Sequence, residues 1–141
     1  MKLRTSGKSS SQTTAKRLSR QSDASSTFSA VSQSGRYVAF DSGATNLIGL
    51  DTSGTTDVFV CDRKTGKTRR VSVRSNGTQG NGPSQIPDIS SSGRFVTFLS
   101  NASNLVPGDT NGVADIFVCD RQNDKTTRVS TRSTETSKRR Q

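Results

Sequence analysis

The 141-residue sequence contains no histidine and no tryptophan, and it has only two cysteines, three prolines and one tyrosine. Without histidine the chain cannot build the serine–histidine–aspartate or cysteine–histidine arrangements of hydrolases. A carboxylate pair for glycoside hydrolysis is the remaining option. Most of the acidic residues, however, recur at equivalent places in an internal repeat, which indicates a structural role. We therefore predict a protein that is not an enzyme, with no catalytic residues and no required cofactor.

Long apolar runs are also absent. No stretch approaches the roughly 20 apolar residues that a membrane-spanning helix needs, so we predict no membrane partner. The first 20 residues lack the apolar region of a secretory signal peptide. They are rich in Arg and Ser and free of acid, which matches an organelle transit peptide only loosely. A polar lead-in is the preferred interpretation.

The formal net charge of +10 lies entirely at the two ends of the chain. Residues 1–22 carry six basic groups and no acidic one, and residues 125–141 carry six basic groups and one acidic residue, Glu135. Residues 23–124 have a net charge of −1. Basic tails attract any polyanion by counterion release. We therefore predict nucleic-acid binding only as a non-specific property of the tails, because no basic face with interleaved aromatic residues is visible.

The strongest pattern in the sequence is an internal repeat of 58 residues. Residues 35–72 match residues 93–130 at 22 of 38 positions without a gap. GRYVAF corresponds to GRFVTF, and DVFVCDR corresponds to DIFVCDR. The segment 15–22 resembles 68–75, so we predict a last-strand fragment of a preceding unit followed by two complete units.

Each unit contains four strand-like runs separated by residues typical of turns. The second and third runs are apolar at consecutive positions, as expected of strands that are covered on both faces. A four-stranded unit of this length, stacked on copies of itself, is a β-propeller blade. The predicted strands are 28–32, 37–42, 57–62 and 68–73 in the first unit, and 86–90, 95–100, 115–120 and 126–131 in the second.

The stretches SSGRFVTF and DIFVCDR, with their first-unit copies, resemble the TolB-like or WD40-like (PD40-type) β-propeller repeat. The resemblance covers residues 14–135 and implies an all-β fold of propeller blades that serves as a scaffold, a partner-binding module or a non-catalytic domain. The chain departs from that family at Ser34 and Ser92, where Asp is usual, and at Cys61 and Cys119, where Arg or an aromatic residue is more frequent. The resemblance suggests a bacterial periplasmic or secreted protein, whereas free cysteines favour the cytoplasm.

We divide the chain into a basic polar segment (1–22), a first blade (23–73), a second blade (74–131) and a basic tail (132–141). Propellers use 4–8 blades, so two blades cannot close a ring as a monomer. Three copies would give six blades and four would give eight. We therefore predict a homo-oligomer of three or more copies, a piece of a longer propeller, or a module that binds another protein. The segment 15–20 could then pair with a blade of a neighbouring chain.

The loop between the second and third strands of each unit is a candidate calcium site. DTNGVAD offers Asp109, Asn111 and Asp115, and hard oxygen ligands of this kind suit calcium. The first copy, DTSGTTD, keeps Asp51 and Asp57 but has Ser53 at the middle position. A calcium-binding module of secreted type is therefore an alternative function. The preferred interpretation is a turn in which Asp and Asn bind their own backbone, with Asp115 simply beginning the strand.

Other recurrent side chains predict structural contacts within each blade. Cys61 and Cys119 are repeat equivalents on strands of successive sheets, and packed sheets lie about 10 Å apart. That separation is too large for a disulfide, so we predict free thiols. The pairs Arg36/Arg94 and Arg63/Arg121, beside Asp62/Asp120, predict ion pairs inside the blades.

Overall fold

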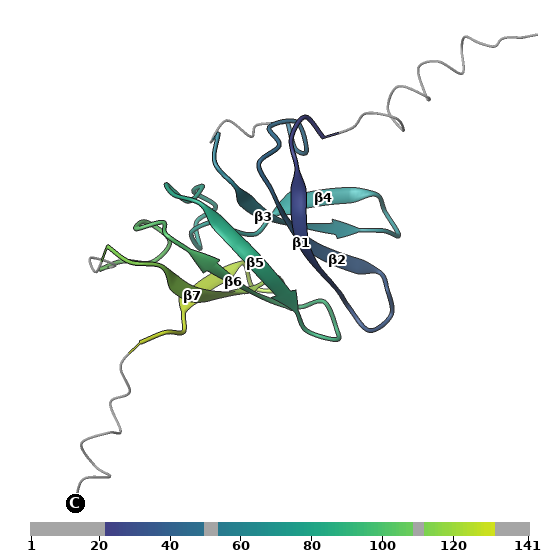
Figure 1. The fold of residues 1–141 in the computed structure, drawn as a ribbon. Coiled ribbons are helices and arrows are strands. Elements are labelled where there is room, and N and C mark those ends of the chain that lie inside the picture. The colour runs from purple at the N-terminus through teal and green to yellow at the C-terminus, as the bar shows by residue number, and fades with distance from the viewer. Residues whose placement is uncertain (1–21, 50–53, 109–111, 132–141) are drawn as a thin grey trace, which may run out of the picture.

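The computed structural model describes residues 22–49, 54–108 and 112–131, and these form two four-stranded antiparallel sheets (Figure 1). Each sheet keeps its strands in chain order, so every strand pairs with its sequence neighbour. The predicted all-β class is confirmed. The first sheet, blade 1, contains β1 (Ser26–Val31), β2 (Tyr37–Ser42), β3 (Asp57–Asp62) and β4 (Lys67–Arg70). The second sheet, blade 2, contains β5 (Ser84–Ile89), β6 (Phe95–Ser100), β7 (Asp115–Asp120) and β8 (Lys125–Arg128).

The inner strands β2, β3, β6 and β7 have the bounds that the repeat predicts. The first strand of each sheet begins two residues earlier than predicted, because each contains a shift of register that breaks the alternating pattern. The last strands end earlier than predicted, at Arg70 and Arg128. Beyond Arg70 one backbone bond remains, from the N–H of Val71 to the carbonyl of Val58 at 2.8 Å. The N–H of Val58 donates instead to the hydroxyl of Ser72 at 3.1 Å.

Strand register is the same in both sheets, residue for equivalent residue. In blade 1, Ala39 lies opposite Val60 and Phe40 opposite Phe59. In blade 2, Phe98 lies opposite Phe117, and the two ring pairs stack with the same centroid separation of 5.8 Å. Each 58-residue unit of the sequence therefore forms one blade, and the two blades have the same strand register.

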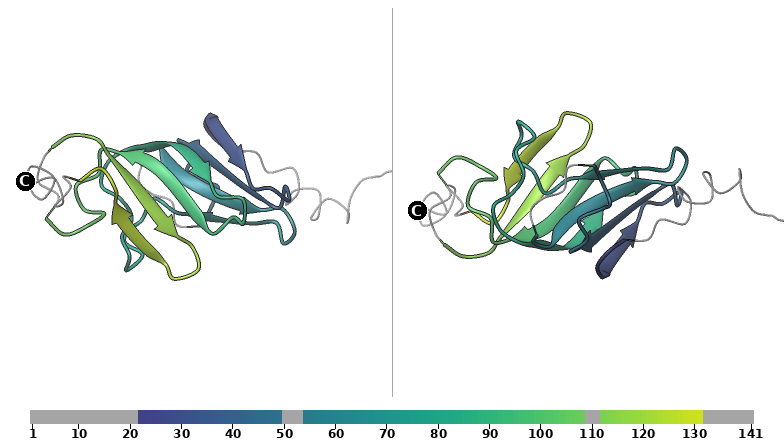
Figure 2. Two further views of the ribbon diagram at one scale, coloured as in Figure 1. Left: turned by 90° about the horizontal axis from the view of Figure 1, so that it is seen from below. Right: turned by 90° about the horizontal axis from the view of Figure 1, so that it is seen from above.

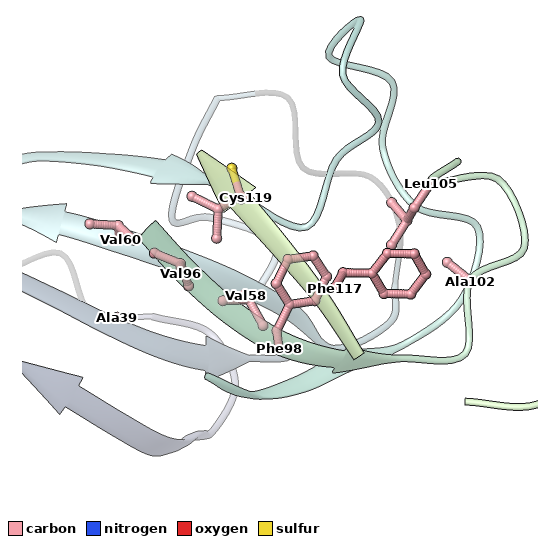
Figure 3. Packing of buried hydrophobic residues seen from close by; sticks show 10 residues of the cluster. Ala39, Val58, Val60, Val96, Phe98, Ala102, Leu105, Phe117 and Cys119 are labelled. Atoms are coloured by element: carbon pink, nitrogen blue, oxygen red, sulfur yellow. The ribbon is translucent and has the colours of Figure 1, made fainter. Parts of the chain in front are cut away.

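The hydrophobic core lies between the two sheets rather than within either of them (Figure 3). Blade 1 contributes Ala39, Val58 and Val60, which alternate along β2 and β3 toward the second sheet. Buried side chains of β6 and β7 in the second sheet pack against them. Leu105, in the loop between β6 and β7, covers one end of the core. The buried residues contributed by blade 2 are Val96, Phe98, Phe117 and Cys119.

We call the surface where the two sheets meet the seam. Here β5 contacts β1, β2 and β3 of blade 1, and the sheets pack face to face with their strands crossing (Figure 2). This is how neighbouring blades of a propeller pack, and two blades are too few to close a ring. In the part of the chain that the structure describes, no helix is long and apolar enough to cross a membrane.

Candidate functional site

Among the described residues, each blade has one face in the seam and one face that no other sheet covers. The second face of blade 1 carries Val38, Phe40, Phe59 and Cys61, and we call it the open face of blade 1. The second face of blade 2 carries Phe95, Thr97, Leu99, Ile116 and Val118, and we call it the open face of blade 2. Among these residues Phe95 and Ile116 are exposed, although they belong to the two most apolar strands of the sheet. These two faces are the candidate interaction surfaces of the molecule.

One aromatic side chain of the seam has two guanidinium groups close to its ring. Tyr37 of blade 1 lies with the carbon of the Arg121 guanidinium 4.6 Å from its ring centre and that of Arg36 at 4.9 Å. Cations over aromatic faces are attracted by the ring quadrupole. Arg121 belongs to blade 2, so the contact joins the sheets. Burial lowers the pKa of Arg121, which remains charged because an arginine pKa is so high.

A glycine lets Tyr37 approach. Gly93, in the turn between β5 and β6, has a φ of +82°, which a residue with a side chain rarely adopts. A Cβ built there would lie 2.2 Å from Cδ2 of Tyr37. The guanidinium of Arg121 also donates from Nη1 to the carbonyl of Gly93. Gly93 and Arg121 therefore form a seat for the tyrosine ring on blade 2.

A buried carboxylate of β2 joins the first strands of the two blades, β1 and β5, across the seam. Asp41 is fully buried and accepts from the hydroxyl of Thr27 and from the N–H of Phe28 at 3.2 Å, both within blade 1. Its second oxygen accepts the N–H of Ile86 in β5 at 2.8 Å. Phe28 and Ile86 are repeat equivalents that lie where β1 and β5 shift register. One carboxylate thus accepts the backbone N–H group at the register shift of both blades.

The predicted ion pairs are confirmed in part. Arg36 holds Asp62 through two parallel bonds of 2.8 and 2.9 Å, and Arg94 holds Asp120 with the same two distances. These hydrogen bonds from arginine keep the pKa of both carboxyl groups well below the usual range. Arg63 and Arg121 behave differently from the prediction, because their guanidinium groups donate to the carbonyls of Gly35 and Gly93. Those carbonyls lie at the β1–β2 and β5–β6 turns, which explains the difference.

Two of the predicted calcium ligands, Asp57 and Asp115, are described, and both carboxylates bind residues at the end of the neighbouring strand. Asp57 accepts the hydroxyl of Ser72 at 2.9 Å and lies 3.4 Å from Nε of Arg70. Asp115 accepts the hydroxyl of Ser130 at 2.9 Å and lies 3.7 Å from a terminal nitrogen of Arg128. The recurrent Arg-Val-Ser segments of the two units thus have a shared role in neutralising the aspartate that begins the third strand.

The other predicted calcium ligands, Asp51, Asp109 and Asn111, lie outside the described residues. Within the described ranges the structure brings together no group of three or more Cys, Asp or Glu side chains that could hold a metal ion. Calcium binding by these loops stays a prediction. Isothermal titration with calcium before and after Asp109→Ala tests it, and an unaltered titration would contradict it.

Both cysteines are free thiols, as predicted. Cys119 faces the seam and is buried, whereas Cys61 is half-buried on the open face of blade 1. Burial raises the pKa of the Cys119 thiol. The two thiols therefore differ in their surroundings although they occupy equivalent positions of the repeat.

A cavity of about 260 Å³ lies where the connection from β4 to β5 passes over β7 and β8. Four arginines line it, with Asp124 as the one acidic neighbour in the lining. Asp124 binds Arg69 at 3.0 Å, and Arg74 donates to the carbonyl of Asn104 at 3.3 Å. A positive lining of this kind suits an anionic group.

Comparison with solved structures identifies the class of fold: the chain has the fold of two neighbouring β-propeller blades. The two blades are similar to part of the structures of TolB proteins. A structure assigned as TolB from Agrobacterium tumefaciens matches 77% of this chain and 31% of its own, at 18% identity and a TM-score of 0.53. TolB from Acinetobacter baumannii matches 78% of this chain and 22% of its own, at 17% identity and a TM-score of 0.49. The chain thus spans less than a third of either. No family model matches it, and no curated protein does so significantly.

The sequence pattern assigns none of the residues that fix the seam to a contact between blades. The pattern assigns Tyr37 and Asp41 only to a strand, and Arg121 to an ion pair within its blade. A signal for two of them is present, because Tyr37 and Asp41 are positions where the second unit differs, with Phe95 and Leu99. Differences between otherwise similar repeats mark the places where the two blades meet different surroundings.

Proposed function

We propose that the chain is a non-catalytic β-propeller scaffold, or protein-interaction module, that assembles with copies of itself. The observation that carries the proposal is the pair of open faces. Phe95 and Ile116 remain exposed on the two inner strands of a sheet whose other face is packed. Large contiguous apolar surfaces of this kind mark interaction sites, because a soluble chain rarely leaves them uncovered.

Self-assembly is favoured over an unrelated partner because the two open faces are repeat equivalents of the two faces that already pack in the seam. Val38 and Phe40 correspond to the buried Val96 and Phe98. Apolar faces of matching shape from two copies would bury one another as the two blades do within one chain. A ring would also cover the exposed apolar faces that make isolated blades prone to aggregate.

Size-exclusion chromatography with light scattering on the full chain tests the proposal. Three copies would close six blades and four copies eight, so we expect a mass of three or four times 15.1 kDa. A compact species with the mass of one chain would overturn self-assembly. Further blades of a longer protein would then be the remaining cover for both open faces.

A second candidate function is non-specific binding of polyanions, supported by the concentration of excess positive charge in residues 1–22 and 125–141. The arginine-lined cavity is a second basic feature, within the folded body. Heparin affinity at increasing salt separates the two sources. Replacing the Lys and Arg residues of 1–22 and 132–141 by Gln in the full chain should abolish salt-sensitive retention. Arg74→Gln should reduce it only if the cavity takes part. Unchanged retention in both variants would contradict this candidate.

A further inference from the structure

The repeat relates the open faces to the seam position by position, which allows the contact between two copies to be specified. A shift of 58 residues converts Tyr37, on the blade 1 side of the seam, into Phe95 on the open face of blade 2. The same shift relates Gly35 and Arg63 of blade 1 to Gly93 and Arg121 of blade 2. The blade 1 side of the seam thus corresponds to the open face of blade 2, and the blade 2 side corresponds to the open face of blade 1.

The seat that holds Tyr37 is already formed a second time, on blade 1. Gly35 has a φ of +81°, against +82° at Gly93, and Arg63 donates from Nη1 to the carbonyl of Gly35 at 2.9 Å. A Cβ at Gly35 would have Arg63 Nη1 as its nearest neighbour, at 3.6 Å, with no ring in reach. The glycine and the guanidinium are therefore preorganised as they are beneath Tyr37. Preorganisation of this kind removes much of the cost of ordering a contact.

The matching ring is available at the other end of the chain. Phe95 is 41% exposed on the open face of blade 2. The Arg94 guanidinium carbon lies 4.8 Å from its ring centre, as that of Arg36 lies beside Tyr37. Only the second guanidinium, which Arg121 supplies in the seam, is missing from this arrangement within the described residues. An incoming Arg63 would supply it.

Resting on the proposed self-assembly, we infer that the open face of blade 2 docks on the open face of blade 1 of a second copy in the geometry of the seam. Phe95 of one copy then packs on Gly35 of the next, beneath its Arg63. The contact is head-to-tail, and such contacts generate rings when the rotation closes. The partner is a second copy of this chain, used in one orientation.

Backbone hydrogen bonds of the seam fit the same relation. Gln33 N–H donates to the carbonyl of Ser91 at 3.0 Å, and these two residues are themselves repeat equivalents. Between copies, the N–H of Ser91 would donate to the carbonyl of Gln33 in the next chain. The bond from Ser84 N–H to the carbonyl of Thr56, 2.8 Å long, would likewise recur from Ser26 to Ala114.

The buried carboxylate of the seam does not recur between copies, which is consistent with a two-blade unit. Asp41 is replaced by Leu99 in blade 2, so a seam between copies contains no equivalent carboxylate. None is needed, because Phe28 of the second copy already donates its N–H to Asp41 of its own blade. Only Ile86 depends on a carboxylate in the neighbouring blade, and that blade belongs to the same chain. Leu99 instead adds apolar area to the surface that must form between separate chains.

A charge exchange tests the contact. In Phe95→Lys, the introduced ammonium group faces Arg63 of the next copy, and in Arg63→Glu the stacking cation becomes an anion. We expect each single variant to fall to the mass of one chain, while the double variant Phe95→Lys/Arg63→Glu regains the wild-type mass because the two introduced side chains attract each other. Lys67→Glu is the control. This exposed residue lies opposite Asp62, on the seam side of blade 1 rather than on an open face, and should keep the wild-type mass.

Circular dichroism and urea unfolding verify that the single variants remain folded, as expected for two exposed side chains. An assembled wild type together with assembled single variants, or a double variant no better than the singles, overturns this contact and leaves self-assembly standing. A wild type with the mass of one chain overturns both the contact and the proposed function. The docking of Phe95 on Gly35 and Arg63 is supported if the double variant regains the wild-type mass and neither single variant does.

Discussion

The two blades have nearly the same sequence and the same register, yet equivalent residues differ widely in burial. Val58 of blade 1 is fully buried, whereas its equivalent in blade 2, Ile116, is 39% exposed. Val71 is 3% exposed and its equivalent Val129 is 54% exposed. These pairs have comparable side chains on equivalent strands or strand ends. The exposed fraction of these side chains therefore depends on whether a neighbouring blade covers them. Their position within their own sheet does not determine it.

The comparison also separates two kinds of stabilising contact. The Arg36–Asp62 and Arg94–Asp120 pairs have equal geometry in the two blades because both partners belong to one sheet. The contacts of Tyr37 with Arg121 and of Asp41 with Ile86 occur once, because they need two sheets. Substitutions at equivalent positions should therefore have equal effects for the first kind of contact and unequal effects for the second.

The largest difference is expected at the phenylalanines of β2 and β6. Phe98 is 1% exposed in the seam, so Phe98→Ala should lower the free energy of unfolding by about 3–5 kcal/mol. Phe40 is only half-buried on the open face of blade 1, and Phe40→Ala should cost about half as much or less in a single chain, because less apolar area is lost. Urea unfolding of both variants measures the difference.

Assembly would remove this inequality. When a second copy covers Phe40 as blade 1 covers Phe98, the two substitutions should cost similar amounts at concentrations where the oligomer is populated. Equal costs in a preparation with single-chain mass would contradict the assignment of Phe40 to an open face.

The next effect concerns the carboxylate that joins the blades. Asp41→Ala leaves the N–H groups of Phe28 and Ile86 without their acceptor, and we expect a loss of about 2–3 kcal/mol in the free energy of unfolding. Asp41→Asn should cost less, because its amide oxygen can still accept one of them. Hydrogen exchange measured by NMR should show faster exchange of the Ile86 amide in both variants.

The reciprocal substitution in blade 2 provides the control. Leu99→Asp places a carboxylate at the equivalent position, but on an open face, so the stability of the single chain should change by no more than about 0.5 kcal/mol. The same variant should weaken assembly, because it puts a charge into an apolar contact. A loss as large as that of Asp41→Ala in a single chain would show that the carboxylate acts within one blade.

The sequence alone predicted much of the fold, because the repeat and the apolar runs locate the inner strands. It missed the irregular starts of β1 and β5, where Ile86 has a φ of +57° and donates to a residue of the other blade. No pattern along one strand contains that partner. The loop sequence predicts Asp57 and Asp115 as calcium ligands or strand starts, whereas the groups that bind them follow later in the chain.

The candidate site was less predictable than the fold for a related reason. Self-comparison of a sequence reveals what two units share, and a seam is made by different positions of two units. The contact of Tyr37 with Arg121 joins residues 84 positions apart whose own equivalents, Phe95 and Arg63, do not meet within the chain. Once the seam within the chain is known, the repeat specifies which residues would meet in a seam between two copies.

A smaller effect, equal in the two blades, is expected from the Arg–Asp pairs in acid. Because the pKa of Asp62 and Asp120 is lowered in the folded protein, the unfolded chain binds more protons near its own pKa of about 3.9. This contribution to stability is present above about pH 5 and is lost as the pH falls through the folded pKa. Asp62→Asn and Asp120→Asn should each remove about half of it, since the two pairs are distant and add.

Thermal unfolding between pH 2 and pH 6 measures this contribution. Arg69→Gln is the matched control, because its partner Asp124 makes a single bond between exposed side chains and should leave the acid slope unchanged. A clear difference between the Asp62 and Asp120 variants in how their thermal stability depends on pH would show that the two blades are not equivalent. It would indicate that one pair is coupled to the seam.

The smallest effect leaves stability unchanged and reports on the open face directly. Cys61 is half-buried on that face, whereas Cys119 is buried in the seam with a raised pKa. A maleimide should therefore modify Cys61 faster than Cys119 in a single chain, on the order of tenfold, because Cys119 reacts only after local opening. Mass spectrometry of peptides from timed reactions gives both rates. In the assembled wild type a second copy would cover Cys61 as blade 1 covers Cys119, so the two rates should converge, and Arg63→Glu should separate them again. Rates that stay different in an assembled wild type would mean that the copies meet through some other surface, because a blade docked in the seam geometry cannot leave Cys61 accessible.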